Sequence, residues 1–267
     1  MFTGLLDRIS RTLQMPSLPV APLGFTEPID SVNYRLEDVS SSFPTLPAQS
    51  AFLGLCEDGY PMLIQLDQPN NGSILIVSDD AAGRTRLAQV MADSACAANP
   101  ASDFKVSVIY SHENHWTKKL DDANARGYLM AKTSATSSKA TDWILQLALL
   151  AEDRSFGRRQ GANLLVILDE ADFLLDADNN VRSNFLWLCQ NGPHFGIHPL
   201  ISVSSEIALE MPEILNHIRT RIYGRMPNRS AFHLSGFSGL ESENFEEGRQ
   251  YVVRNENLWI PFWTPRT

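Results

Sequence analysis

The chain has 267 residues, 43% hydrophobic and 20% charged, a composition that indicates a globular protein with a large core and excludes an intrinsically disordered chain. Its 31 acidic and 22 basic residues give a formal net charge of −9, which disfavours general binding to nucleic acid or anionic membranes. Cys56, Cys96 and Cys189 are far apart and form no C-x-x-C pair, so they predict neither a disulfide framework nor a zinc site. We find no apolar run of about eighteen residues and no secretory signal, and we expect a cytoplasmic protein without a transmembrane segment.

Residues 1–48 are predicted to precede the main domain, which we assign to residues 49–267. Apolar residues recur on one face of a helix over residues 2–13, as is typical of an amphipathic helix; they are Phe2, Leu5, Leu6, Ile9 and Leu13. Prolines at positions 16, 19, 22 and 28 then interrupt any helix and predict an extended arm. Two interpretations of the helix stay open: an arm that docks to a protein or touches a membrane, or a helix that packs on its own domain or on a neighbouring copy.

Strands alternate with helices along the rest of the chain. A lead-in hairpin is predicted at Ala51–Cys56 and Met62–Leu66, because Asp58-Gly59 between them is a strong turn signal. Further strands are predicted at Gly72–Val77, Phe104–Tyr110, Asn163–Leu168, Pro199–Val203 and Arg221–Met226. Helices are predicted at Gly83–Ala98, Thr141–Arg154, Arg182–Gln190 and Pro212–His217.

Two segments complete the expected architecture. Ser111–Ala140 is polar and is expected to be an irregular surface segment with one short helix around Tyr128. Tyr251–Arg254 and Leu258–Phe262 are expected to form a C-terminal hairpin. The alternation predicts an α/β fold with a mainly parallel central sheet flanked by helices.

A strand, a loop and a helix at Ser73–Ala98 form the context of a phosphate-binding loop of the pattern G-x-x-x-x-G-K-[ST]. In the aligned stretch, Gly83 and Thr85 are retained, whereas the first glycine is Ser78 and the lysine is Arg84. Asp79 and Asp80 bring negative charge to the place where a polyphosphate would bind. A carboxylate is itself favourable at a helix N-terminus. We therefore hypothesise that Asp79 or Asp80 fills the anion site and that Arg84 pairs with it.

The strand Asn163–Leu168 ends in Asp169-Glu170, the arrangement of a Walker B strand. There the Asp holds magnesium through water and the Glu polarises the attacking water. The position also suits the tendency of ligands to bind at strand carboxyl ends in open parallel sheets. The alternative is a buried strand that ends in two solvated carboxylates.

Residues downstream of this strand resemble one family. Gly196-Ile197-His198 before an apolar run, followed by the stretch Asn216–Ile222 (NHIRTRI), is similar to the FtsK/SpoIIIE/HerA class of hexameric P-loop ATPases. The hairpin at Leu53–Leu66 also resembles the lead-in hairpin of that class, so the likeness runs from Ala51 to Gly236. The resemblance implies a RecA-like P-loop NTPase fold.

The resemblance also implies roles for single residues. It makes Asp169 and Thr85 the metal-site residues and Glu170 the catalytic acid/base, with Arg221 at the family's R-I position. It puts Ser204 where the family has a sensing Gln. Loss of that Gln, of the lysine and of the first glycine removes groups that position phosphate and water, so we expect weak or absent binding of ATP and Mg²⁺.

Three functions follow from these features. The first is a pseudo-ATPase that serves as an interaction or regulatory subunit, in a homo-oligomeric ring or beside an active homologous ATPase, similar to the degenerate ATPase modules of type VII secretion. The second is an active translocase of DNA or polypeptide that uses Arg84 in place of the lysine. The third is a nucleotide sensor that binds ATP without hydrolysis. DNA is the least supported partner because of the net charge of −9.

Overall fold

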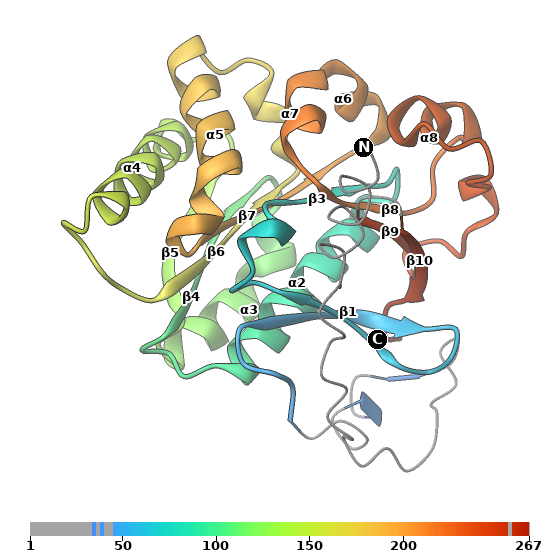
Figure 1. Cartoon of the computed structure of the whole chain (residues 1–267), viewed down its shortest axis with the longest axis horizontal. Coiled ribbons are helices and arrows are strands. Elements are labelled where there is room, and N and C mark those ends of the chain that lie inside the picture. Colours follow the sequence, from blue (N-terminus) through green and yellow to red (C-terminus); the bar gives the residue numbers. More distant parts are fainter. Residues whose placement is uncertain (1–33, 36–37, 40–44, 256–257, 267) are drawn as a thin grey trace, which may run out of the picture.

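A ten-stranded sheet, with strand order β2-β1-β10-β9-β8-β3-β7-β6-β4-β5, runs through the whole molecule (Figure 1). The computed structural model describes residues 34–35, 38–39, 45–255 and 258–266. The predicted helix over residues 2–13 and the proline-rich arm lie outside the described residues, so both stay predictions.

Six strands of the sheet run parallel, as expected from the alternation of strands and helices. They are β3 (Ile74–Val77), β4 (Phe104–Tyr110), β5 (Leu129–Ser134), β6 (Asn163–Asp169), β7 (Ile197–Val203) and β8 (Thr220–Tyr223). The predicted strands at these places are confirmed, except that β8 is shorter and β5 was not expected. β7 lies between β3 and β6. The strand before the candidate phosphate loop and the strand that ends in Asp169 are therefore one strand apart.

Two hairpins extend the sheet in antiparallel fashion. The lead-in hairpin is β1 (Ser50–Cys56) with β2 (Pro61–Gln65), and the C-terminal hairpin is β9 (Gln250–Asn255) with β10 (Leu258–Trp263). Both predicted hairpins are confirmed. β1 and β10 approach closely because Gly54 has no side chain: a Cβ there would lie 2.1 Å from the backbone oxygen of Trp263.

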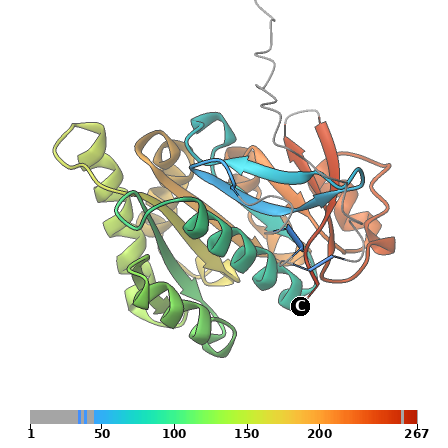
Figure 2. The same cartoon turned by 90° about the horizontal axis from the view of Figure 1, so that it is seen from below.

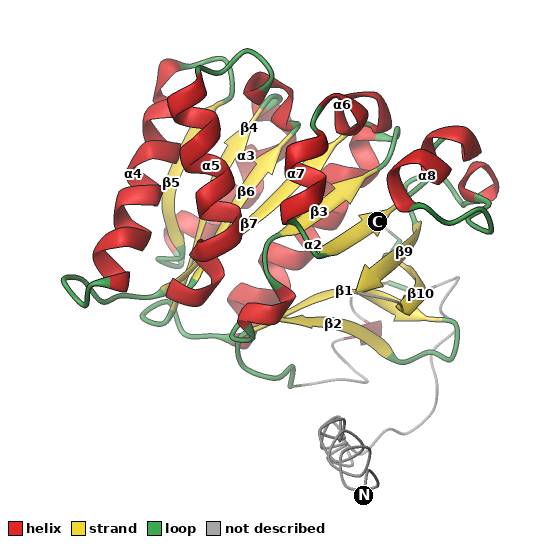
Figure 3. Cartoon of the chain, turned by 45° about the horizontal axis from the view of Figure 1, so that its top comes forward, coloured by secondary structure: helices red, strands yellow, loops and turns green. Residues whose placement is uncertain are grey.

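Helices cover both faces of the parallel part. α4 (Ser138–Ser155), α5 (Asn179–Asn191), α6 (Ser205–Glu210), α7 (Pro212–His217) and α8 (Asn228–Ser235) lie on one face, and α2 (Ala81–Ala98) and α3 (Glu113–Ala125) lie on the other (Figure 3). α2 also packs against β1 (Figure 2). Short 3-10 turns occur at Pro69–Asn71, Ala171–Leu174, Gly192–Phe195 and Ser242–Asn244.

The apolar run of β6 follows from this sandwich. Its residues 164, 166 and 168 belong to the core under α4 and α5, whereas Leu165 and Ile167 belong to the core under α2 and α3. A strand covered on both faces needs apolar residues at every position, since successive side chains point to opposite faces.

The segment 111–140 differs from the expected irregular surface. It holds α3 and the edge strand β5, and Tyr128 lies in the turn between them instead of in a helix. Trp116 and Leu120, one helical turn apart, are the buried residues of α3. Polar residues at most of the other positions of α3 hide this narrow stripe in the sequence. α6 and α8 were not predicted either.

Candidate functional site

The candidate site lies where parallel strands end. The carboxyl ends of β3, β6, β7 and β8 meet at one edge, because Val77 is level with Val203 and with Tyr223, and Asp169 is level with Ser202. The loops that follow bring the stretch 78–85, Asp169-Glu170 and Ser204 to this edge. In open α/β sheets ligands bind at this position.

Asp169 is the centre of a buried hydrogen-bond network. Thr85 Oγ1 donates to its Oδ2 at 2.8 Å and Trp116 Nε1 donates to the same oxygen at 2.7 Å. Ser202 Oγ donates to Oδ1 at 2.9 Å. Three donors therefore satisfy a carboxylate that is only 3% exposed. Thr85 and Asp169, which the resemblance assigns to a metal site, are thus in contact, and the metal role stays a prediction.

Glu170 and Arg84 form an ion pair beside this network, with 3.6 Å between Arg84 Nη2 and Glu170 Oε1. Their side chains are 5% and 16% exposed, Arg84 being the more buried. His112, at the start of α3, lies 3.3 Å from the other oxygen of Glu170. Arg84 also donates to the backbone oxygen of Ser78. The predicted pairing of Arg84 with Asp79 or Asp80 is therefore wrong.

The backbone at Glu170 holds its carboxylate in this place. Glu170 has φ +62° and ψ +77°, the left-handed region that a residue with a side chain adopts at a cost of roughly 1–3 kcal/mol. Its N–H donates to Ser202 Oγ at 3.0 Å, and its backbone oxygen accepts from Ser111 Oγ at 3.2 Å. Two side chains thus fix the conformation from both ends.

The loop before α2 is tied to neighbouring loops instead of being open. Asp79 accepts hydrogen bonds from the N–H of Ser205 at 2.8 Å and from its hydroxyl at 3.1 Å. Ser78 Oγ donates to the backbone oxygen of Arg225 at 3.1 Å, and the N–H of Asp79 donates to the same oxygen at 2.9 Å. The Asp79 carboxylate is therefore bound to Ser205 at the start of α6, whereas Arg84 pairs with Glu170.

The C-terminal part of the chain packs on the first turn of α2. A Cβ on Gly83 would lie 2.5 Å from Gly248 Cα, 2.6 Å from Asp80 Oδ2 and 2.7 Å from Tyr251 Oη. Burial, and after it the charge of Asp80, raises the pKa of the Tyr251 phenol. Asp80 precedes α2 directly, so a carboxylate does lie at this helix N-terminus, although its side chain makes no capping hydrogen bond. The glycine at position 83 is thus required by the packing of the chain itself.

The cavity beside this loop is acidic. It has a volume of about 570 Å³ and is lined by Asp79, Asp80, Arg225, Met226, Pro227, Glu243 and Glu247. The one cation among these residues, Arg225, pairs with Glu247 at 2.5 Å. Four carboxylates against one paired guanidinium repel a polyphosphate.

The other two predicted site residues have structural partners. Ser204 caps α6, since its Oγ accepts from the N–H of Ile207 at 3.3 Å. Arg221 donates to the backbone oxygens of Ile218, at 2.9 Å, and Leu215, at the end of α7. Among the described residues, Arg221 makes no ion pair with Asp169 or Glu170. A role for Arg221 across a subunit interface stays a prediction.

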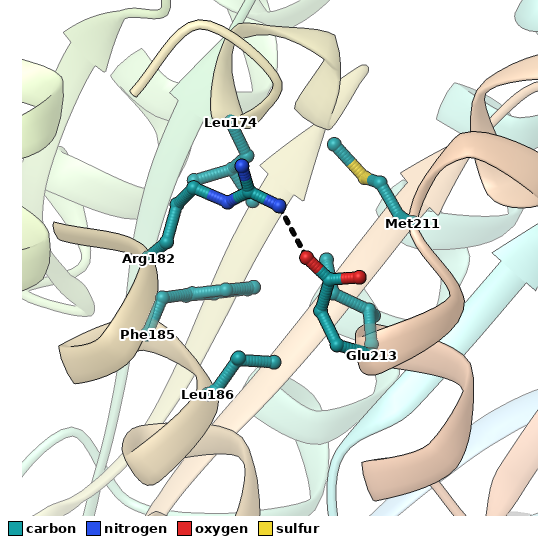
Figure 4. A pocket seen from close by; sticks show the side chains of 7 residues that line it. Leu174, Arg182, Phe185, Leu186, Met211 and Glu213 are labelled. Atoms are coloured by element: carbon teal, nitrogen blue, oxygen red, sulfur yellow. Dashed lines mark hydrogen bonds and ion pairs between the residues drawn. The ribbon is translucent and has the colours of Figure 1, made fainter. Parts of the chain in front are cut away.

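A second, apolar pocket lies between α5 and α7 (Figure 4). The ion pair of Arg182 and Glu213 spans it, and Leu174, Phe185, Leu186, Met211 and Ile214 complete its lining. Its volume is about 10 Å³, which is hardly the space of one water. In this conformation the pocket is too small for a ligand.

Sequence reasoning missed Trp116, His112 and Ser202. Trp116 and His112 belong to the segment that was expected to be irregular. Ser202 is a small polar residue inside an apolar run, a pattern that often marks a buried hydrogen-bond donor. Gly248 gave no signal, because only the tertiary fold brings it to α2.

The groups that a magnesium nucleotide needs are engaged elsewhere. Asp169 Oδ2 accepts from both Thr85 and Trp116, and the Arg84 guanidinium faces Ser78 and Glu170. As arranged here, the residues do not fit Mg²⁺ and phosphate in the P-loop manner. In the described part of the chain no three His, Cys, Asp or Glu residues are grouped to hold a metal ion. No described helix meets the length and apolarity needed to cross a bilayer.

The fold is shared with solved P-loop ATPases. EccC from Thermomonospora curvata (ATPases 2 and 3, with a signal sequence peptide) has a TM-score of 0.69 and 12% identity, over 88% of this chain and 43% of that chain. EssC from Geobacillus thermodenitrificans (ATPases 2 and 3) has a TM-score of 0.68 and 12% identity, over 88% of this chain and 44% of that chain. The pCW3 conjugation coupling protein TcpA with ATPγS has a TM-score of 0.66 and 13% identity, over 87% of this chain and 70% of that chain.

These neighbours are FtsK/SpoIIIE-type P-loop ATPases, and the chain has their RecA-like P-loop NTPase fold. It spans less than half the length of the EccC and EssC chains that it matches. No family profile and no curated protein sequence matches this chain.

Proposed function

We propose that this P-loop domain is a pseudo-ATPase that acts as an interaction or regulatory subunit. One observation carries the proposal: the Arg84 guanidinium and the Glu170 carboxylate are paired with each other in a largely buried position. An ATPase needs the cation on the phosphates and the carboxylate on the attacking water. Here each group neutralises the other.

Electrostatics of the loop supports the same function. Polyphosphate binding at a helix N-terminus depends on free N–H groups and positive charge. Asp80 lies at the start of α2 and Asp79 in the same loop, and the adjoining cavity adds Glu243 and Glu247. A nucleotide with about four negative charges would have to displace or outweigh these carboxylates.

The partner is proposed to be a protein. In the EccC and EssC structures, ATPases 2 and 3 occur together, and the EccC structure holds a signal sequence peptide. A domain of this fold beside another ATPase, in one chain or in a ring, would fit that arrangement. The net charge of −9 argues against DNA. We propose a cytoplasmic location, because the EccC domain that shares this fold is a cytoplasmic domain.

Thermal unfolding with and without about 1 mM Mg²⁺-ATP tests the proposal. At a dissociation constant of about 10 µM, mass action would raise the melting temperature by roughly 5–10 °C. We expect no such rise, and we expect phosphate release by the wild type no faster than by Glu170→Gln. A rise together with phosphate release that Glu170→Gln abolishes would overturn the proposal in favour of an active ATPase.

A second candidate function is a nucleotide sensor that binds without hydrolysis. The retained contact between Thr85 and Asp169, at 2.8 Å, favours it, because P-loop proteins use this pair at the metal site. TcpA, which shares the fold, was solved with ATPγS. A rise in melting temperature without phosphate release would select this function over the first.

A further inference from the structure

The indole of Trp116 occupies one side of the carboxylate that a P-loop ATPase uses at its metal site. Trp116 is 1% exposed, and its Nε1 lies 2.7 Å from Asp169 Oδ2. Thr85 Oγ1 donates to the same oxygen at 2.8 Å. α3 brings the indole here, one turn after His112, which contacts Glu170. The start of α3 thus contacts both acidic residues at the end of β6, Asp169 through Trp116 and Glu170 through His112.

This geometry leaves no free direction on Oδ2. A carboxylate oxygen offers about two lone-pair positions, and both on Oδ2 are used. Oδ1 accepts from Ser202 at 2.9 Å and is buried with the rest of the side chain. An indole N–H only donates, so Trp116 cannot itself bind a cation. A divalent cation could approach Oδ2 only if the indole or the Thr85 hydroxyl moved away.

We propose that Trp116 takes the place of a divalent cation at Asp169. As a neutral donor it satisfies the buried carboxylate, keeps Thr85 and Asp169 in contact, and makes the stability of the site independent of metal. The inference deepens and rests on the proposed function above, since it explains how an Asp at a Walker B position is retained without metal chemistry. Trp116 acts through Asp169 and is a positioning residue.

Trp116→Phe tests the inference, because it keeps an aromatic ring and removes the indole N–H together with the rest of the five-membered ring. Its melting temperature should fall by roughly 4–10 °C without metal, since the buried carboxylate loses a hydrogen bond to its charged form. About 10 mM Mg²⁺ should restore a clear part of this loss, and NaCl of equal ionic strength should not. The wild type should not respond to Mg²⁺.

Trp143→Phe is the matched control, because Trp143 Nε1 donates at 2.7 Å to the hydroxyl of Ser107, a neutral acceptor. It should lose stability without gaining a response to Mg²⁺. Trp116→Phe/Asp169→Asn removes the charge as well, so it should be more stable than Trp116→Phe alone and indifferent to Mg²⁺. This double variant also serves if Trp116→Phe alone does not fold.

Three results would overturn the inference: Trp116→Phe that is as stable as the wild type, equal responses of both Phe variants to Mg²⁺, or no gain in stability from Asp169→Asn. Stabilisation of the wild type by Mg²⁺-ATP would overturn the proposed function instead. Failure of the Trp116 inference and failure of the proposed function therefore give different results.

Discussion

Gly83→Ala is the perturbation that tests most directly whether the chain itself fills the loop. Within a helix, Gly→Ala normally stabilises a protein by about 0.5–1 kcal/mol. At position 83 the added Cβ would lie 2.5 Å from Gly248 Cα, which is backbone and cannot rotate away. Asp80 Oδ2 at 2.6 Å and Tyr251 Oη at 2.7 Å close two further directions. Overpacking of this kind costs about 1–3 kcal/mol.

The net expectation is a loss of about 1–2 kcal/mol, or a fall in melting temperature of roughly 2–8 °C for a chain of this size. Urea unfolding of the wild type and Gly83→Ala, without nucleotide, measures it. Tyr251→Phe in the Gly83→Ala background should recover only a small part, because the contact with the backbone of Gly248 stays. A Gly83→Ala variant that is as stable as the wild type or more stable would refute the packing argument. The glycine at position 83 would then be explained only by the approach of a phosphate to the backbone, as in a phosphate-binding loop.

Two further predictions concern charged and titratable groups. Arg84→Met and Glu170→Gln should each lower the free energy of unfolding. The double variant should lose about 1–3 kcal/mol less than the sum of the two single losses, because either substitution already leaves the partner unpaired. Additive losses would contradict the buried pair. Burial, with the charge of Arg154, lowers the pKa of His198 from 6.5 to about 4, so the folded protein excludes a proton that the unfolded chain binds. The free energy of unfolding should therefore fall by roughly 3 kcal/mol between pH 6.5 and 4. His198→Leu should flatten this slope in urea unfolding and exposed His233→Gln should not; equal slopes in both variants would contradict it.

The parallel part of the fold could be predicted because its signals are local. The apolar run Asn163–Leu168 predicts a doubly covered strand, and the turn at Asp58-Gly59 predicts the lead-in hairpin. Both are confirmed, as is the C-terminal hairpin. The phosphate-loop and Walker B patterns also assigned Thr85, Asp169 and Glu170 to one site, and their roles there stay predictions.

The segment from 111 to 134 could not be predicted in the same way. α3 buries two residues, Trp116 and Leu120, whereas β5 lies at the edge of the sheet, where residues such as Met130 stay exposed. Such elements are stabilised by the strands they pack on more than by their own sequence pattern. Their stabilising contacts are long-range, and the periodicity of a single sequence does not record them.

From its sequence alone, the chain specified a P-loop fold with an altered loop and an acidic pair after β6. Only the tertiary structure decided how these charges are used. Arg84 pairs with Glu170 instead of with Asp79 or Asp80, Trp116 donates to Asp169, and Gly248 packs on Gly83. Each of these contacts joins residues on different elements, and its energy depends on distance and burial. A list of residues gives the charges, whereas the packing of the helices on the sheet decides which charges meet.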